Sequence, residues 1–325
     1  MRLVLLASLG VLGCTSQLGP DRMPPPVDAA ALVRPASPPS NGAAAARRHS
    51  VEIDGHALVV WCKSAAEPRD AIVLVHGRTW STLPDFDLQV PGERRSLMDV
   101  LVEHGFAVYG VDLRGYGATA RDDSGWLTPS RAVEDVAGVL AWVGARHPEL
   151  EPPTLLGWSM GALVVQLTAQ RHPDRLSTLV LYGHPRDPDA VHPAGPGPEA
   201  RPPRRKTTAR AAAEDFTRPE VVSRATIEAF VDAALRTDPV KVDWRATDEL
   251  AELDPAAVRV PTLLIHGEHD PYTPIDAQAK LFSRLGNPDR AWVIVPGGDH
   301  AAHLEDTAPR FVDAVVTFVR RARLR

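Results

Sequence analysis

The fold is decided by the sequence Leu155-Leu156-Gly157-Trp158-Ser159-Met160-Gly161-Ala162-Leu163. A short apolar run over residues 154–156 is typical of a buried strand, and apolar residues recur at helical spacing from Leu163 as far as His172-Pro173. Gly-x-Ser-x-Gly between a strand and a helix predicts a tight turn that presents the serine hydroxyl. The two glycines have no Cβ, so the strand and the helix can approach each other closely. Ser159 is therefore the candidate nucleophile, at a helix N-terminus whose N–H groups favour a developing oxyanion.

The composition is that of an ordinary globular protein. Of the 325 residues, 44% are hydrophobic and 24% are charged, which is enough apolar material for a large core. The length allows one large domain or two small ones. A net charge of -5 gives no general attraction to nucleic acid, and we expect no nucleic acid partner.

The first 13 residues predict a lipoprotein signal peptide. Arg2 supplies a positive charge, and residues 3–12 form an apolar run that is too short to span a bilayer. The run ends in Val11-Leu12-Gly13-Cys14, which resembles a bacterial lipobox, in which the cysteine is lipidated. This resemblance implies a lipid anchor on Cys14 and a location in the cell envelope, facing the periplasm or the exterior. An ordinary secretory signal and a mis-assigned start codon are the alternatives.

Residues 14–48 predict a tether. They are rich in Pro and Ala and contain almost no large apolar side chains, so they cannot bury enough surface to form a core. The folded domain is expected over residues 49–325. If Cys14 is lipidated, Cys62 is the one remaining cysteine and no internal disulfide is possible.

Strands alternate with helical patterns through this domain, which predicts an α/β fold with a mostly parallel central sheet and helices on both faces. Asp54-Gly55 predicts a two-residue hairpin turn near its start. Between residues 185 and 253 the composition changes. The first part is rich in Pro, Gly and Arg, and the second carries helical patterns. We name residues 185–253 the insertion and expect it to be a lid over the carboxyl edge of the sheet, although a disordered loop is the alternative for its first part.

Four motifs in one order carry a resemblance to a known family, over about residues 51–319. They are a strand that ends in His76-Gly77, the Gly-x-Ser-x-Gly turn, a strand that ends Gly267-x-x-Asp270, and Gly298-x-His300 before the last helix. This arrangement resembles the α/β-hydrolase family. The resemblance implies a catalytic triad of Ser159, Asp270 and His300, with His303 as the rival base in the same loop.

The resemblance also implies an oxyanion hole made of backbone N–H groups. Met160 supplies one donor in this scheme, and Arg78 supplies the other, with Thr79 as the alternative. His76 is expected to brace that loop, and Asp112 with Arg114 to form a salt-bridged structural turn. Glu268, His269 and Asp270 could suggest metal ligands, but no other residues supply the spacing of a metal site. We therefore expect no metal, and we expect no cofactor.

Serine at the turn favours hydrolysis of a small-molecule carboxylic ester or thioester through an acyl-enzyme. Amide hydrolysis, C–C bond hydrolysis, acyl transfer and perhydrolysis use the same triad and stay open, as does a non-catalytic binding protein on the same fold. Trp80, Trp158 and Met160 are expected to give the pocket an apolar wall, which Trp126 joins unless it is a core residue.

Overall fold

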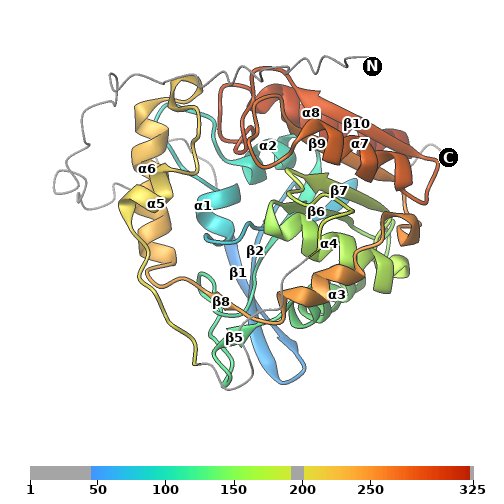
Figure 1. Cartoon of the computed structure of the whole chain (residues 1–325), viewed down its shortest axis with the longest axis horizontal. Coiled ribbons are helices and arrows are strands. Elements are labelled where there is room, and N and C mark those ends of the chain that lie inside the picture. The colour runs from blue at the N-terminus through green and yellow to red at the C-terminus, as the bar shows by residue number, and fades with distance from the viewer. Residues whose placement is uncertain (1–44, 192–200, 323–325) are drawn as a thin grey trace, which may run out of the picture. The chain divides into compact units, whose positions relative to one another are not determined.

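The computed structural model describes residues 45–191 and 201–322 (Figure 1). The expected signal peptide, the lipidation site Cys14 and the tether as far as residue 44 lie outside the described residues. The first strand, β1 (Arg47–Ile53), begins two residues before the predicted start of the domain. Arg47 pairs with Cys62 of β2 (His56–Ser64) through the backbone, and backbone pairing needs no apolar side chain that a sequence pattern would show.

The core is an eight-stranded sheet in the order β1-β2-β4-β3-β6-β7-β9-β10. β1 pairs antiparallel with β2 through the turn Asp54-Gly55, where φ is 49° and 71°, and β2 pairs antiparallel with β4. The other neighbours are parallel, which confirms the expected mostly parallel sheet. These strands are β3 (Asp70–Val75), β4 (Phe106–Asp112), β6 (Thr154–Trp158), β7 (Thr178–Tyr182), β9 (Thr262–Gly267) and β10 (Arg290–Val295).

Helices cover both faces of the sheet, as predicted. One face packs against α3 (Pro129–Arg146), α4 (Met160–Arg171) and α7 (Ile275–Arg284). The other packs against α1 (Thr82–Phe86), α2 (Leu97–Glu103) and α8 (Ala308–Ala322). Alternate residues of β3 enter the two cores, which explains why this strand is a continuous apolar run.

The insertion contains α5 (Ala209–Ala213), α6 (Arg224–Thr237) and the short strand β8 (Asp243–Trp244). β8 pairs in parallel with β5 (Trp126–Leu127), and α6 lies beside α1 in Figure 1. Short 3-10 turns complete the described chain at Pro173–Arg175, Pro219–Val221, Thr247–Glu252 and Pro255–Ala257. No helix within residues 45–191 or 201–322 is long and apolar enough to cross a membrane.

Candidate active site

Ser159 lies in a strained turn between β6 and α4. Its φ of 57° and ψ of -119° fall in a region that residues with a side chain rarely adopt. The turn is also crowded. A Cβ on Gly157 would lie 2.3 Å from the carbonyl oxygen of Gly161, and one on Gly161 would lie 2.4 Å from that of Val75. Both positions therefore exclude any residue larger than glycine, as the sequence motif predicts.

Asp270 and His300 meet although they follow different strands, β9 and β10. His300 Nδ1 lies 2.8 Å from Asp270 Oδ2, and the backbone N–H of Tyr272 donates to Asp270 Oδ1 over 2.9 Å. Because both carboxylate oxygens accept, the proton of the neutral His300 ring is on Nδ1, and the lone pair of Nε2 is free to take a proton.

The end of β7 joins this pair to the serine turn. The N–H of Ser159 donates to the carbonyl of Tyr182 over 2.9 Å. The next residue, Gly183, lies against the pair, because a Cβ there would lie 3.2 Å from His300 Nδ1 and 3.4 Å from Asp270 Oδ2. The Trp158 indole donates to the carbonyl of His300 over 2.9 Å, which ties the serine turn to the loop of His300.

His303 has a different environment from His300. Its Nε2 lies 2.7 Å from the carbonyl oxygen of Asp85, so Nε2 carries the proton. Its Nδ1 lies 3.0 Å from the Tyr182 hydroxyl, whose proton it shares with the carbonyl oxygen of His300 at 2.9 Å. Both ring nitrogens are thus engaged. Burial lowers the pKa of His303 to about 3, with a smaller contribution from the charge of His300. The structure therefore places His303 as a buried brace.

The loop after β3 carries the expected oxyanion donor Arg78. Gly77 lies directly against the nucleophile, since a Cβ there would lie 3.6 Å from Ser159 Cβ. The His76 ring sits beneath this loop and lies 2.9 Å from the carbonyl of Gly77, in agreement with the predicted brace. Met160 is the first residue of α4, so its N–H has no acceptor within the helix.

The turn after β4 is structural, as expected. Asp112 is buried and accepts from the Trp61 indole at 2.9 Å and from the backbone N–H of Thr82 at 3.1 Å. Arg114 forms its ion pair with Asp135 of α3, at 2.8 Å. Within residues 45–191 and 201–322, no group of three or more His, Cys, Asp or Glu side chains is arranged to hold a metal ion.

Sequence reasoning missed Asp215, in the turn after α5. Its carboxylate accepts from the Trp80 indole, and burial raises its pKa to about 6, opposed by smaller contributions that include the charge of His300. Asp215 is thus an acidic group of the insertion that is bonded to Trp80, two residues after Arg78. A lone Asp among the charged residues of the insertion gives no pattern by which to identify it.

The four aromatic and apolar residues expected to line the pocket are all buried: Trp80, Trp126, Trp158 and Met160. Trp80 packs edge-on against Phe230 of α6, and Trp158 stacks on Tyr182. Trp158 also contacts the His300 ring, with centroids 5.3 Å apart. The apolar pocket wall itself stays a prediction. Trp126 belongs to β5, at the small sheet with β8.

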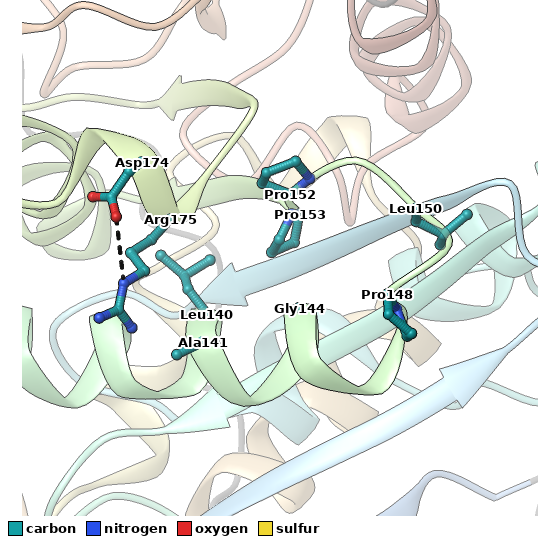
Figure 2. Close-up of a pocket in the computed structure, with 9 residues that line it drawn as sticks. All are labelled: Leu140, Ala141, Gly144, Pro148, Leu150, Pro152, Pro153, Asp174 and Arg175. Atoms are coloured by element: carbon teal, nitrogen blue, oxygen red, sulfur yellow. Dashed lines mark ion pairs between the residues drawn. The ribbon is translucent and has the colours of Figure 1, made fainter.

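A surface hollow of about 220 Å³ lies elsewhere (Figure 2). Pro152 and Pro153 line it together with Leu140 and Gly144 of α3. These prolines precede β6, whereas Ser159 follows β6, so the hollow is at the opposite end of the nucleophile strand and is separate from the candidate active site.

Comparison with known proteins gives the family. The sequence profile of the family described as serine aminopeptidase, S33, matches residues 66–307. The chain belongs to this family of hydrolases. It is accordingly an α/β-fold serine hydrolase with esterase-like and lipase-like relatives.

The relatives include two lipid or ester hydrolases. The chain is 26% identical over 282 residues to the monoacylglycerol lipase of Mycolicibacterium smegmatis, over 80% of this chain and 91% of that protein. It is 32% identical over 208 residues to a pimeloyl-[acyl-carrier protein] methyl ester esterase of Aromatoleum aromaticum, over 54% of this chain and 79% of that protein. A thermophilic esterase from Thermogutta terrifontis has the same fold, with a TM-score of 0.58, 22% identity, and coverage of 85% of this chain and 99% of that one.

Proposed function

We propose that this serine hydrolase cleaves carboxylic esters or thioesters of small molecules through an acyl-enzyme. Ser159 is the nucleophile, His300 the base and Asp270 the group that orients His300. The backbone N–H groups of Met160 and Arg78 form the oxyanion hole. The observation that carries the proposal is the 2.8 Å bond between His300 and Asp270, placed across the end of β7 from a strained serine turn. The esterase and lipase names of the relatives support an ester substrate.

In the proposed mechanism each residue has its own step. His300 Nε2 takes the hydroxyl proton of Ser159 as Oγ attacks the carbonyl carbon, and the same nitrogen then protonates the leaving alcohol or thiol. Asp270 holds the ring by Nδ1 and stabilises the imidazolium. The two N–H groups stabilise the tetrahedral oxyanion. A water molecule then gives a proton to His300 Nε2 and attacks the acyl carbon. The bond from the acyl carbon to Ser159 Oγ breaks, the acyl group leaves as a carboxylic acid, and His300 returns the proton to Ser159.

The test uses the domain from residue 45 onward together with the full chain, each with and without Ser159→Ala. We expect a fluorophosphonate probe to label the wild-type protein and to leave Ser159→Ala unlabelled. A panel of esters, thioesters and amides with one common acyl group then ranks the leaving groups. A labelled protein that hydrolyses amides and leaves the esters intact would contradict ester specificity.

Asp215 favours a second candidate, the hydrolysis of amides whose substrate carries a free amine. The Asp215 carboxylate accepts from the indole of Trp80, which follows the oxyanion donors Arg78 and Thr79, and a substrate ammonium group there would form a charge-assisted hydrogen bond with it. The name of the family, an aminopeptidase, is consistent with such a substrate. The discriminating experiment compares an amino-acid arylamide with its N-acetyl derivative, in the wild type and in Asp215→Asn. A preference for the free amine that Asp215→Asn removes supports this candidate, and equal rates in the wild type oppose it.

We propose two further features from the sequence. Cys14 is the site of a lipid anchor that holds the domain in the cell envelope, and the insertion acts as a lid that sets access and acyl preference. The second proposal is supported by the position of α6 against α1, next to the loop of Arg78. Shortening the chain between residues 193 and 203 should change the preference among acyl chain lengths more than it changes the rate with a very small ester. An unchanged preference profile would indicate that this part of the insertion is inert.

A further inference from the structure

Three buried side chains hold three successive peptide groups of the oxyanion loop, which we define as residues 76–81. The N–H of Gly77 donates to Asp85 Oδ2 over 3.1 Å, and the carbonyl of Gly77 accepts from His76 Nδ1 at 2.9 Å. The next carbonyl, that of Arg78, accepts from the Tyr116 hydroxyl. The side chains of Asp85, His76 and Tyr116 have no exposed surface. The loop is therefore fixed peptide by peptide.

The state of the His76 ring follows from its second contact. The backbone N–H of Leu113 donates to His76 Nε2 over 3.2 Å, so Nε2 is an acceptor and Nδ1 carries the proton given to Gly77. Burial lowers the pKa of His76, which favours this neutral ring.

These contacts orient the N–H groups that matter for catalysis. In a trans peptide the N–H points away from the carbonyl of the same unit. Because His76 donates to the Gly77 carbonyl, the N–H of Arg78 in the same peptide group points away from the His76 ring. Because Tyr116 donates to the Arg78 carbonyl, the N–H of Thr79 points away from Tyr116. Both candidate donors depend on side chains that contact only the opposite side of the loop.

Tyr116 is in turn held by the insertion. The indole Nε1 of Trp244, in β8, donates to the Tyr116 hydroxyl over 2.8 Å. The Tyr116 hydroxyl therefore acts both as an acceptor, from Trp244, and as a donor, to the carbonyl of Arg78. The His76 and Tyr116 rings also contact each other, with centroids 4.3 Å apart.

A second bond set joins the insertion to the same loop. Asp238, at the end of α6, accepts at Oδ2 from the N–H and the hydroxyl of Ser81, at 2.9 Å and 2.8 Å. Its Oδ1 accepts from the N–H of Gly117 at 2.8 Å. Asp238 therefore fixes the end of the oxyanion loop and the residue next to Tyr116, and both depend on the insertion being docked.

We propose that Tyr116 is a positioning residue of the oxyanion loop, and that Trp244 fixes its hydroxyl so that docking of the insertion completes the oxyanion hole. This inference rests on the proposed function, because it assumes that the loop stabilises an oxyanion. Tyr116 itself touches no reacting atom. It holds the Arg78–Thr79 peptide group, which supplies the N–H of Thr79, the alternative donor. This peptide group directly follows the one that supplies the N–H of Arg78, the proposed donor.

The first test is Tyr116→Phe, which removes one hydroxyl and keeps the ring. We expect kcat on a small aryl ester to fall roughly 10- to 100-fold, less than the loss of a whole oxyanion donor, with KM nearly unchanged. The affinity for an alkyl boronic acid, whose tetrahedral adduct carries the oxyanion, should fall by a similar factor. If Tyr116 had a purely structural role, Tyr116→Phe would lower the melting temperature, and the folded enzyme would keep the wild-type kcat and boronic acid affinity.

The matched control is Tyr109→Phe. Tyr109 is another buried tyrosine, of β4, and its hydroxyl bonds to His147 at 2.7 Å on the face covered by α3. This variant should lose stability and keep kcat. Trp244→Phe preserves the Tyr116 hydroxyl and removes its donor together with part of the buried ring, and we expect about a 3- to 10-fold loss of kcat in the same sense.

Two results overturn the inference. One is a Tyr116→Phe enzyme with wild-type kcat and boronic acid affinity. The other, decisive where Tyr116→Phe does not fold, is a Trp244→Phe enzyme with both values unchanged. Ser159→Ala separates this failure from failure of the proposed function. If Ser159→Ala hydrolyses the ester at the wild-type rate, Ser159 is not the nucleophile and the proposed function itself is wrong.

Discussion

The backbone N–H of Arg218, in the insertion, donates to Oδ2 of Asp299 over 2.7 Å, and Asp299 is the residue before His300. The Thr217 hydroxyl donates to the same oxygen, while the N–H of His300 donates to Oδ1. The insertion is therefore bonded directly to the loop of the proposed base, as well as to the oxyanion loop.

Thr217→Val should loosen this attachment by about 1 kcal/mol, the typical net contribution of one hydrogen bond, without removing the bond of Arg218. We expect limited proteolysis within the insertion to become roughly five-fold faster, since cleavage follows the population of the open form. Ser283→Ala removes a hydroxyl of α7 away from the site and serves as the control. Equal cleavage rates in Thr217→Val and the wild type would mean that this contact does not restrain the insertion.

The proposed triad predicts a sharp difference between two histidines of one loop. Ser159→Ala and His300→Ala should each lower kcat by about 10⁴ or more with the fold intact. His303→Ala should retain much more activity, because both of its ring nitrogens are already engaged in buried hydrogen bonds. Steady-state kinetics on one ester, with circular dichroism to confirm folding, decides the matter. An active His300→Ala beside an inactive His303→Ala would assign the base to His303.

The parts of the molecule that could be predicted from sequence are those with local signals. A buried parallel strand needs an apolar run, and the serine turn needs Gly157 and Gly161, because carbonyl groups occupy the space of a Cβ. These requirements act over a few residues, so they leave a readable pattern.

The supporting contacts could not be predicted, because they join residues that are far apart in sequence. Trp244 lies 128 residues from Tyr116, and Asp215 lies 135 residues from Trp80. Each of these side chains is an ordinary Trp, Tyr or Asp in the sequence, and its hydrogen bond forms only when the insertion packs against the rest of the domain. The first two residues of β1 leave no readable pattern for a related reason, since Arg47 joins the sheet by backbone pairing with Cys62, which requires no apolar side chain.

Alanine should have opposite effects at Gly161, in the crowded serine turn, and at Gly144, in α3. Gly161→Ala should destabilise the protein by several kcal/mol, because its Cβ would meet the carbonyl groups of Val75 and His76 within 2.5 Å. Gly144→Ala, in α3, meets nothing within 4 Å and should stabilise the protein by about 0.5–1 kcal/mol through helix propensity. Urea unfolding measures both, and a tolerated Gly161→Ala would contradict the close packing of strand and helix.

His303 predicts a loss of stability in acid. Its folded pKa of about 3 lies below the ordinary value of 6.5, so the unfolded chain binds the proton more tightly. The stability from neutral burial is complete above pH 6.5 and is lost as the pH falls from 6.5 toward 3. Between pH 7 and pH 5 this residue should account for about 2 kcal/mol of the decrease in unfolding free energy.

His303→Gln should therefore show a shallower decrease over the same interval, whatever its stability at pH 7. The exposed His269 provides the control, since His269→Gln should keep the wild-type slope. A His303→Gln protein with the wild-type slope would show that His303 does not contribute to acid sensitivity.

The proposed anchor predicts membrane association. The full chain, expressed in a bacterium that processes lipoproteins, should fractionate with membranes and incorporate labelled fatty acid, and Cys14→Ala should abolish the label. Ester hydrolysis by the released domain should be unchanged. Soluble, unlabelled wild-type protein would exclude lipidation at Cys14.

The position of β1 has a practical consequence for immobilising, labelling or fusing this enzyme. The described chain enters the sheet at one edge, and the strand that carries the nucleophile lies four strands away, about 19 Å at the usual strand spacing. The base follows β10, at the far edge. A resin, a dye or a fused protein joined ahead of residue 45 is thus coupled to the margin of the molecule remote from the reacting groups, and immobilised preparations should keep the turnover of the free enzyme.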